Sequence, residues 1–214
     1  MRDVLESLER WRERGEDIAV ATVINTWGSA PRPVGSKMVS TRSGGIAGSV
    51  SAGCVENAVL EAGENVMATG QPRLLHYGVA DDTAWDVGLA CGGEIEIFVE
   101  PFSALESVYD QIKSYLEARE PIAVVSVLNG PPQMMNRKLI VLEDGRTEGT
   151  LELGEHRERV VQAALNLLMR ETGGVIDLEG GPTLFVETYP AAPRLIIVGA
   201  VHIAEALITM ANAA

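Results

Sequence analysis

The sequence lacks any apolar run of the roughly 18 residues that a transmembrane helix needs, and residues 1–17 carry charges throughout. Neither a membrane span nor a secretory signal peptide is therefore expected, and we expect a cytoplasmic protein. Cysteine is also nearly absent. Two cysteines in 214 residues are too few for a disulfide framework, so both are expected to be free thiols.

Positive charge is scarce too, because 17 Lys and Arg stand against 30 Asp and Glu, for a net charge of -13 at pH 7. This excess repels nucleic-acid phosphates and anionic lipid surfaces, which argues against nucleic acid or a membrane as partner. An anionic ligand would need a local source of positive charge. The composition, 46% hydrophobic and 22% charged residues, is that of an ordinary folded protein.

Hydrophobic periodicity predicts an α+β N-terminal domain with a mixed sheet over residues 1–190. Apolar residues at helical spacing indicate a helix ending before Gly15 and helices from 55, over 103–119 and over 155–170. β-Branched and alternating runs indicate strands at 18–27, 37–41, from 46, 73–77, 94–99, 122–128, 138–142, 147–151, 174–178 and 183–188. Between 77 and 94 lies a long acidic loop of the kind that is often functional. We find no internal repeat.

Residues 191–214 resemble the first βα unit of a Rossmann-like α/β domain, with a strand over 195–198, a turn at Gly199 and a helix to the end. Of the three glycines in the dinucleotide fingerprint only Gly199 is present, since Val201 and Ala204 occupy the other positions. We therefore do not expect this chain to bind NAD(P). A strand that is apolar on both faces has to be covered, which favours a partner or a homo-oligomer.

The two cysteines are both flanked by glycines. Cys54 follows the small-residue loop that starts at Gly48 and precedes a helix, where free amides and the helix dipole stabilise a thiolate. Cys91 lies in Gly-Leu-Ala-Cys-Gly-Gly, just before a strand. Their separation and the lack of a C-x-x-C pair argue against zinc. Burial as a small hydrophobic residue is an equally weighted alternative.

Four segments occur in an order that resembles the XdhC/CoxI family of maturation factors: TVINTWGSAPRPVGSKM, GIAGSVSAGCVE, GLACGGEIEIFVEP and LIIVGAVHIAEAL. The resemblance implies a chaperone, rather than a catalyst, that binds molybdenum cofactor. It implies two partners: a cysteine desulfurase for sulfuration, and a molybdenum hydroxylase of the xanthine dehydrogenase or carbon monoxide dehydrogenase type that receives the cofactor. An NAD(P)-binding oxidoreductase and a noncatalytic interaction module are the alternatives.

The same resemblance suggests the site. Soft thiolates suit molybdenum or a transferred sulfur, so Cys54 and Cys91 are the candidate catalytic and metal-binding residues. Candidate cofactor-binding residues are Arg32, Lys37, Gly48, Ser49, Ser51, Gly53, Glu56, Gly92, Gly93 and Gly199. For Glu56 the helix dipole alone is the favoured explanation. Trp27 and Trp85 could stack on a pterin, but packing is favoured. Asp81, Asp82 and Asp86 are expected to be solvated rather than to bind a cation.

Overall fold

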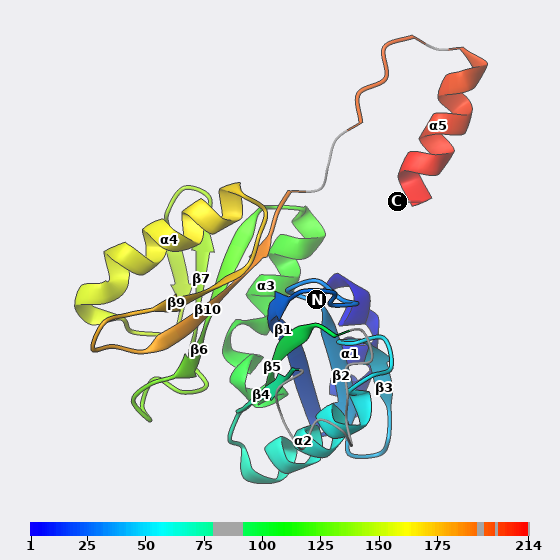
Figure 1. Cartoon of the computed structure of the whole chain (residues 1–214). Helices are drawn as coiled ribbons and strands as arrows, with labels where there is room; N and C mark the ends of the chain where they lie inside the picture. The colour runs from blue at the N-terminus through cyan, green and yellow to red at the C-terminus, as the bar shows by residue number, and fades with distance from the viewer. Residues whose placement is uncertain (79–91, 192–194, 200, 214) are drawn as a thin grey trace.

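The computed structural model describes residues 1–78, 92–191, 195–199 and 201–213 of the chain. Its strands form two five-stranded sheets (Figure 1). The first sheet has the order β3-β2-β1-β5-β4, with β1 (Ile18–Trp27), β2 (Lys37–Thr41), β3 (Ile46–Gly48), β4 (Arg73–Tyr77) and β5 (Glu94–Pro101). The second has the order β8-β7-β6-β10-β9, with β6 (Ile122–Asn129), β7 (Lys138–Leu142), β8 (Thr147–Gly149), β9 (Gly174–Asp177) and β10 (Thr183–Tyr189).

Five α-helices accompany the described strands: α1 (Leu5–Glu13), α2 (Glu56–Thr69), α3 (Glu106–Ala118), α4 (Arg157–Met169) and α5 (His202–Ala213). The predicted α+β class is confirmed. The described strand pairs are all antiparallel, so the expected mixed sheet is not found. Tight hairpins join β2 to β3 and β7 to β8, and such short connections hold neighbouring strands antiparallel.

The chain contains an internal structural repeat. In both the first half (residues 1–101) and the second half (residues 102–189), a helix precedes three strands, a second helix and two more strands, and the two sheets have matching strand order. Equivalent positions share backbone constraints. A Cβ at Gly48 would lie 2.2 Å from the carbonyl oxygen of Lys37, and one at Gly149 would lie 2.4 Å from that of Lys138. The prediction of no internal repeat is therefore wrong for the structure, because the halves share turn geometry and burial rather than residue identity.

The core is divided into layers that follow this repeat. In the first half, α2 packs on the first sheet through an apolar cluster that includes Val59 and Ile97. In the second half, α4 packs on the second sheet through a cluster that includes Val160 and Leu184. A third cluster, to which α1, α3 and both sheets contribute, contains Tyr109 and joins the halves. This shared core explains why β1 and β6 are buried over nearly their whole length.

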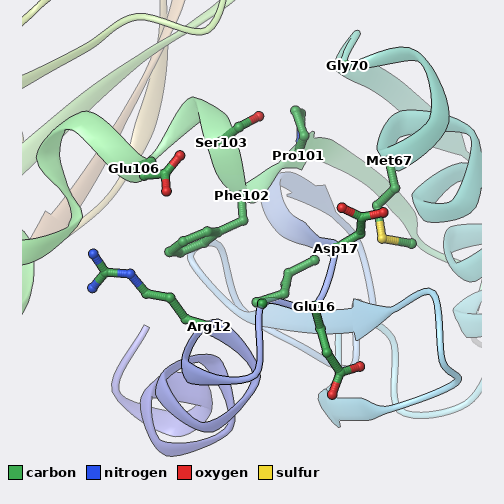
Figure 2. Close-up of a pocket in the computed structure, with 11 residues that line it drawn as sticks. Arg12, Glu16, Asp17, Met67, Gly70, Pro101, Phe102, Ser103 and Glu106 are labelled. Atoms are coloured by element: carbon green, nitrogen blue, oxygen red, sulfur yellow. The ribbon is translucent and has the colours of Figure 1, made fainter.

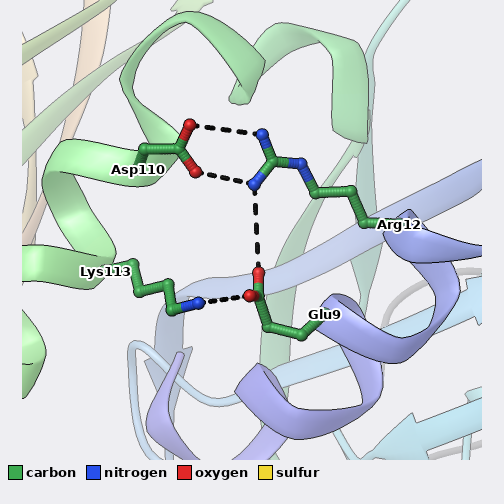
Figure 3. Close-up of polar contacts among 4 residues, drawn as sticks. All are labelled: Glu9, Arg12, Asp110 and Lys113. Carbon is green, nitrogen blue, oxygen red and sulfur yellow. Dashed lines mark hydrogen bonds and ion pairs between the residues drawn. The ribbon is translucent and has the colours of Figure 1, made fainter.

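A network of charged side chains also links the halves at the surface (Figure 3). Arg12 on α1 donates two hydrogen bonds to Asp110 on α3, at 2.6 and 3.3 Å. Glu9 accepts a hydrogen bond from Lys113. The hydrogen bond from Arg12 lowers the pKa of Asp110, and that from Lys113 lowers the pKa of Glu9. The first helix of one half is thus held against the first helix of the other.

The C-terminal segment differs from its prediction. The helix α5 is present, but residues 195–198 are not a strand. No described strand pairs with them, and an unpaired strand leaves its backbone groups without partners. Several apolar side chains here are exposed, among them Ile196 and Val198. Within the described residues, no helix is long and apolar enough to cross a membrane.

Candidate functional site

Three of the glycine-rich segments meet at one place, which we name the loop cluster and define as residues 28–36, 48–56 and 92–93. Gly28 and Gly93 are in close approach, because a Cβ at Gly28 would lie 3.4 Å from the Cα of Gly93. A Cβ at Gly93 would lie 2.9 Å from the carbonyl oxygen of Trp27. Since neither glycine has a side chain, the two backbones can touch, and the end of β1 lies directly beside the start of β5.

Arg32 connects the first two segments of the loop cluster. Its Nε donates a hydrogen bond to the backbone carbonyl of Ser49 at 3.3 Å. Its guanidinium lies 3.9 Å from the carboxylate of Asp3, and the side chain is about one-third exposed. The predicted local cation is therefore next to the predicted loop, and part of it still faces solvent.

Glu56 occupies the centre of the 48–56 loop. Its carboxylate accepts hydrogen bonds from the Ser49 hydroxyl at 2.7 Å, the Ser51 amide at 2.9 Å and the Gly53 amide at 2.8 Å. The Ser51 hydroxyl donates to it as well. These are the amides and hydroxyls that the sequence assigns to an anionic ligand. That expectation is corrected here, because an internal carboxylate already takes the place such an anion would need.

The environment of Glu56 keeps its carboxylate ionised. Partial burial would raise the pKa, but the hydrogen bonds from Ser51 and Ser49 outweigh burial and lower the pKa to about 2. Positive φ angles at Gly48, Ala52 and Gly53 give the loop the curvature that points these groups inward. The carboxylate is therefore a structural anion that holds the loop in one conformation.

Cys54 is partly buried at the edge of the loop cluster. It packs against the apolar cluster between α2 and the first sheet, and it is a free thiol. The structure therefore combines the two interpretations of this cysteine, a core position and partial access. Cys91, Trp85 and the three aspartates Asp81, Asp82 and Asp86 lie outside the described residues.

Lys37 does not supply free positive charge to the site. Its ammonium is buried, lies 2.9 Å from the carboxylate of Glu187 on β10, and donates to the hydroxyl of Thr22 at 2.7 Å. The prediction of Lys37 as an anion-binding cation is corrected, because its charge is already paired inside the protein. Sequence spacing could not show this, since Glu187 belongs to the other half.

Trp27 was expected to pack, and this expectation is wrong. It is the last residue of β1 and its side chain is 70% exposed. The strand runs past the edge of the core there, so the indole has little to pack on. A large exposed aromatic side chain beside a glycine-rich loop is a typical contact residue, and the alternation of the strand gave no sign of it.

Most predicted binding residues thus come together in the loop cluster. These are Arg32, Gly48, Ser49, Ser51, Gly53, Glu56, Gly92 and Gly93, with Cys54 among them. Gly199 does not join them: it lies in the segment before α5, which stands apart from the two sheets in Figure 1. The Lys37 side chain points into the interior.

A separate cavity of about 310 Å³ opens at the turn between α1 and β1 (Figure 2). It is lined by Glu16 and Asp17 from this turn, by the end of α2, and by Glu106 at the start of α3. It contains none of the predicted site residues. Its acidic lining identifies no ligand by itself.

The fold and the loop cluster define an α+β protein with a glycine-lined loop site next to a thiol. Residues 11–78 match the model of the XdhC and CoxI family. The predicted resemblance is confirmed, and over these residues the chain is a member of that family.

Two curated relatives support this placement. The molybdenum cofactor insertion chaperone PaoD of Escherichia coli is 31% identical over 111 residues, which are 51% of this chain and 34% of PaoD. A Bacillus subtilis protein, named as one of the probable xanthine dehydrogenase subunits, is 24% identical over 202 residues, 90% of this chain and 56% of that protein. The chain therefore spans between a third and a little over half of these relatives.

A solved structure shares the fold. A Bacillus halodurans protein described as a xanthine dehydrogenase superposes with a TM-score of 0.62 over 86% of this chain and 52% of that chain, at 24% identity. The two-sheet architecture is therefore found in a protein of known structure.

Proposed function

We propose that this chain binds molybdenum cofactor as cargo and assists its insertion into a molybdenum hydroxylase. The observation that carries this proposal is the loop cluster, in which the sequence segments that resemble the family meet around Cys54. Support also comes from the relative named as a molybdenum cofactor insertion chaperone, which shares 31% identity with half of this chain.

The residues of the loop cluster fit part of this cargo well. The Cys54 thiol is a soft donor of the kind that suits molybdenum or a transferred sulfur, and it is partly accessible. Arg32 offers a guanidinium for the phosphate, on a chain whose net charge is otherwise -13. The loop amides do not fit the phosphate, because Glu56 already binds them. We therefore assign the phosphate to Arg32 and not to the loop backbone.

Two finer steps belong to the same proposal. A cysteine desulfurase supplies sulfur for exchange with an oxo ligand of the bound cofactor, and a hydroxylase of the xanthine dehydrogenase or carbon monoxide dehydrogenase type receives the product. Partial access to Cys54 is compatible with both encounters. Co-purification of the full chain with a tagged desulfurase, compared between Cys54 and Cys54→Ser proteins, tests the first of them.

Cofactor retention tests the central claim. The full chain is loaded with molybdenum cofactor, desalted and oxidised, and retained pterin is measured by fluorescence while molybdenum is measured by mass spectrometry. Cys54→Ser should lower retained molybdenum about tenfold, because a hydroxyl is a poor soft-metal ligand. Arg32→Gln should lower retention of both pterin and molybdenum by a similar factor, because the phosphate loses its charged partner.

Arg42→Gln is the matched control, since Arg42 is an exposed arginine paired with Asp17 outside the loop cluster. It should retain cofactor like the unsubstituted chain. Undiminished retention in both Cys54→Ser and Arg32→Gln, with unchanged thermal stability, would contradict the proposed function.

A further inference from the structure

A second cavity, of about 330 Å³, lies between the two halves. One wall comes from the end of β1 and from the 28–36 loop, through Thr26, Pro33 and Gly35. The opposite wall comes from β10, through Phe185 and Glu187, and from the turn that follows α4. The 28–36 loop therefore faces this cavity and also carries Arg32 of the loop cluster.

Glu187 is the charged group of this cavity. The residue is only 9% exposed, and its ion pair with Lys37 fixes the direction of its carboxylate. Burial would raise the pKa of Glu187, but the ammonium of Lys37 outweighs burial and lowers it, so the carboxylate is ionised at neutral pH. A carboxylate has about four acceptor positions, so one ammonium does not exhaust it. Lys37 is absent from the cavity wall and acts as a positioning residue.

The internal repeat supplies a comparison for this ion pair. Lys138 and Glu100 occupy the equivalent positions, with their charged atoms 2.5 Å apart and Ser126 in the place of Thr22. There, the side chain of Asn136 bridges to the carbonyl oxygen of Gly70 at 3.1 Å. Gly35 is the equivalent of Asn136 and has no side chain to form this bridge. The cavity therefore exists at the Glu187 pair because a glycine replaces the asparagine.

We propose that this cavity binds the 2-amino-4-oxopyrimidine ring of a pterin, with the Glu187 carboxylate accepting hydrogen bonds from the ring's adjacent amino and ring N–H groups. Two parallel N–H donors match the two oxygens of a carboxylate, as in other bidentate pairs. Phe185, Pro33 and Val34 offer apolar surface to the flat ring, and Thr26 offers a hydroxyl. The inference rests on the proposed function and assigns the end of the cofactor that lies away from the metal.

Trp27 is a rival position for the same ring. Thr26 and Trp27 are consecutive in β1 and pair regularly with β5, so their side chains point to opposite faces of the sheet. Thr26 lines the cavity and Trp27 does not. A ring bound in the cavity is therefore not stacked on Trp27, and the two positions can be separated by substitution.

The test is a fluorescence titration of the full chain with pterin and with lumazine, the 2,4-dioxo analogue that carries an oxygen in place of the 2-amino group. Pterin should bind about tenfold or more tightly than lumazine, because the extra oxygen would face the carboxylate. Equal affinity for the two compounds would overturn the proposal. Guanosine presents the same edge on a purine, and tighter binding of guanosine than of pterin would also overturn it.

Variants identify the cavity as the site. Replacing the ion pair by Lys37→Met with Glu187→Met removes the carboxylate without leaving a buried charge, and should abolish the preference for pterin. The matched control is Lys138→Met with Glu100→Met, which removes the equivalent pair and should keep the preference. Retained preference in the first double variant, or loss of pterin binding in Trp27→Ala alone, would contradict the assignment.

The inference and the proposed function fail in different ways. If the unsubstituted chain retains molybdenum cofactor but does not distinguish pterin from lumazine, the cavity assignment is wrong and the proposed function stands. If it retains no cofactor and binds neither compound, both are wrong.

Discussion

The two halves of the chain have the same topology but different loops, and the difference separates residues that build the fold from residues that build the site. Gly48 and Gly149 are equivalent, as are Gly53 and Gly154, and all four have positive φ angles. Both halves therefore need glycine at these points. By contrast, Glu56 at the start of α2 has Arg157 as its counterpart at the start of α4.

The residues around Glu56 differ between the halves in the same way. Ser51 and Cys54 lie in the first-half loop, whereas the second-half loop has Glu152 and Glu155 at the equivalent positions. The second half folds without a serine-lined carboxylate or a thiol. We conclude that Ser51, Cys54 and Glu56 are not demanded by the topology, which supports their assignment to the loop cluster's function.

The largest predicted effect concerns the buried ion pairs that cross between the halves. Glu100→Ala should destabilise the protein by about 3–5 kcal/mol, because it leaves the ammonium of Lys138 buried without its partner. Chemical denaturation followed by fluorescence measures this loss. Lys138→Met combined with Glu100→Met should restore most of the stability. A loss below about 1 kcal/mol in Glu100→Ala would show that the buried pair does not matter to folding.

A somewhat smaller effect tests the repeat itself. Gly48→Ala and Gly149→Ala should each cost about 2–3 kcal/mol, because each adds a Cβ that meets a backbone carbonyl at a positive φ angle. The two losses should be alike if the positions are equivalent. Gly15→Ala is the control, because Gly15 has a positive φ angle but open space around it. A large loss in only one half would break the comparison.

The smallest effect distinguishes the two equivalent helix starts. Glu56→Gln should cost about 1–3 kcal/mol at neutral pH, because the loop's donors lose a charged acceptor. Arg157→Gln should cost less than about 0.5 kcal/mol, because its side chain is on the surface. Equal losses from the two substitutions would contradict the special role of the first-half loop.

The cost of Glu56→Gln should also depend on pH. Folding lowers the pKa of Glu56 from 4.5 to about 2, so its stabilising effect is complete above pH 4.5 and is lost as the pH falls toward 2. The stability of the unsubstituted chain and of Glu56→Gln should therefore converge over this interval. Denaturation midpoints measured from pH 2 to pH 6 would show it, and a constant difference between the two proteins would contradict it.

Much of this structure could be predicted from local patterns. The strands at 18–27, 37–41 and 73–77 have the bounds that their β-branched runs predicted. The helix predicted over 155–170 is α4 (Arg157–Met169), with a short turn of 3-10 helix before it. The glycine-rich segments were also recognised as loops. Period and turn residues are local signals, and they survive the comparison with the structure.

The errors share one cause, which is that a residue's partner came from a distant part of the chain. Lys37 was expected to face a ligand, but Glu187 lies on a strand of the other half. The amides near Ser51 were expected to be open, but Glu56 folds back onto them. Residues 195–198 were expected to form a strand, but no described strand pairs with them.

The sequence by itself determined the order of helices and strands, the glycines at the sharp turns and the thiol at the start of α2, because each depends on neighbours a few residues away. Only the tertiary structure decided that the chain folds as two equivalent halves, that their buried charges cross between the sheets, and that a cavity opens beside one pair and not at its counterpart. These features depend on which distant groups meet when apolar surfaces are buried, and burial determines whether each charge finds a partner.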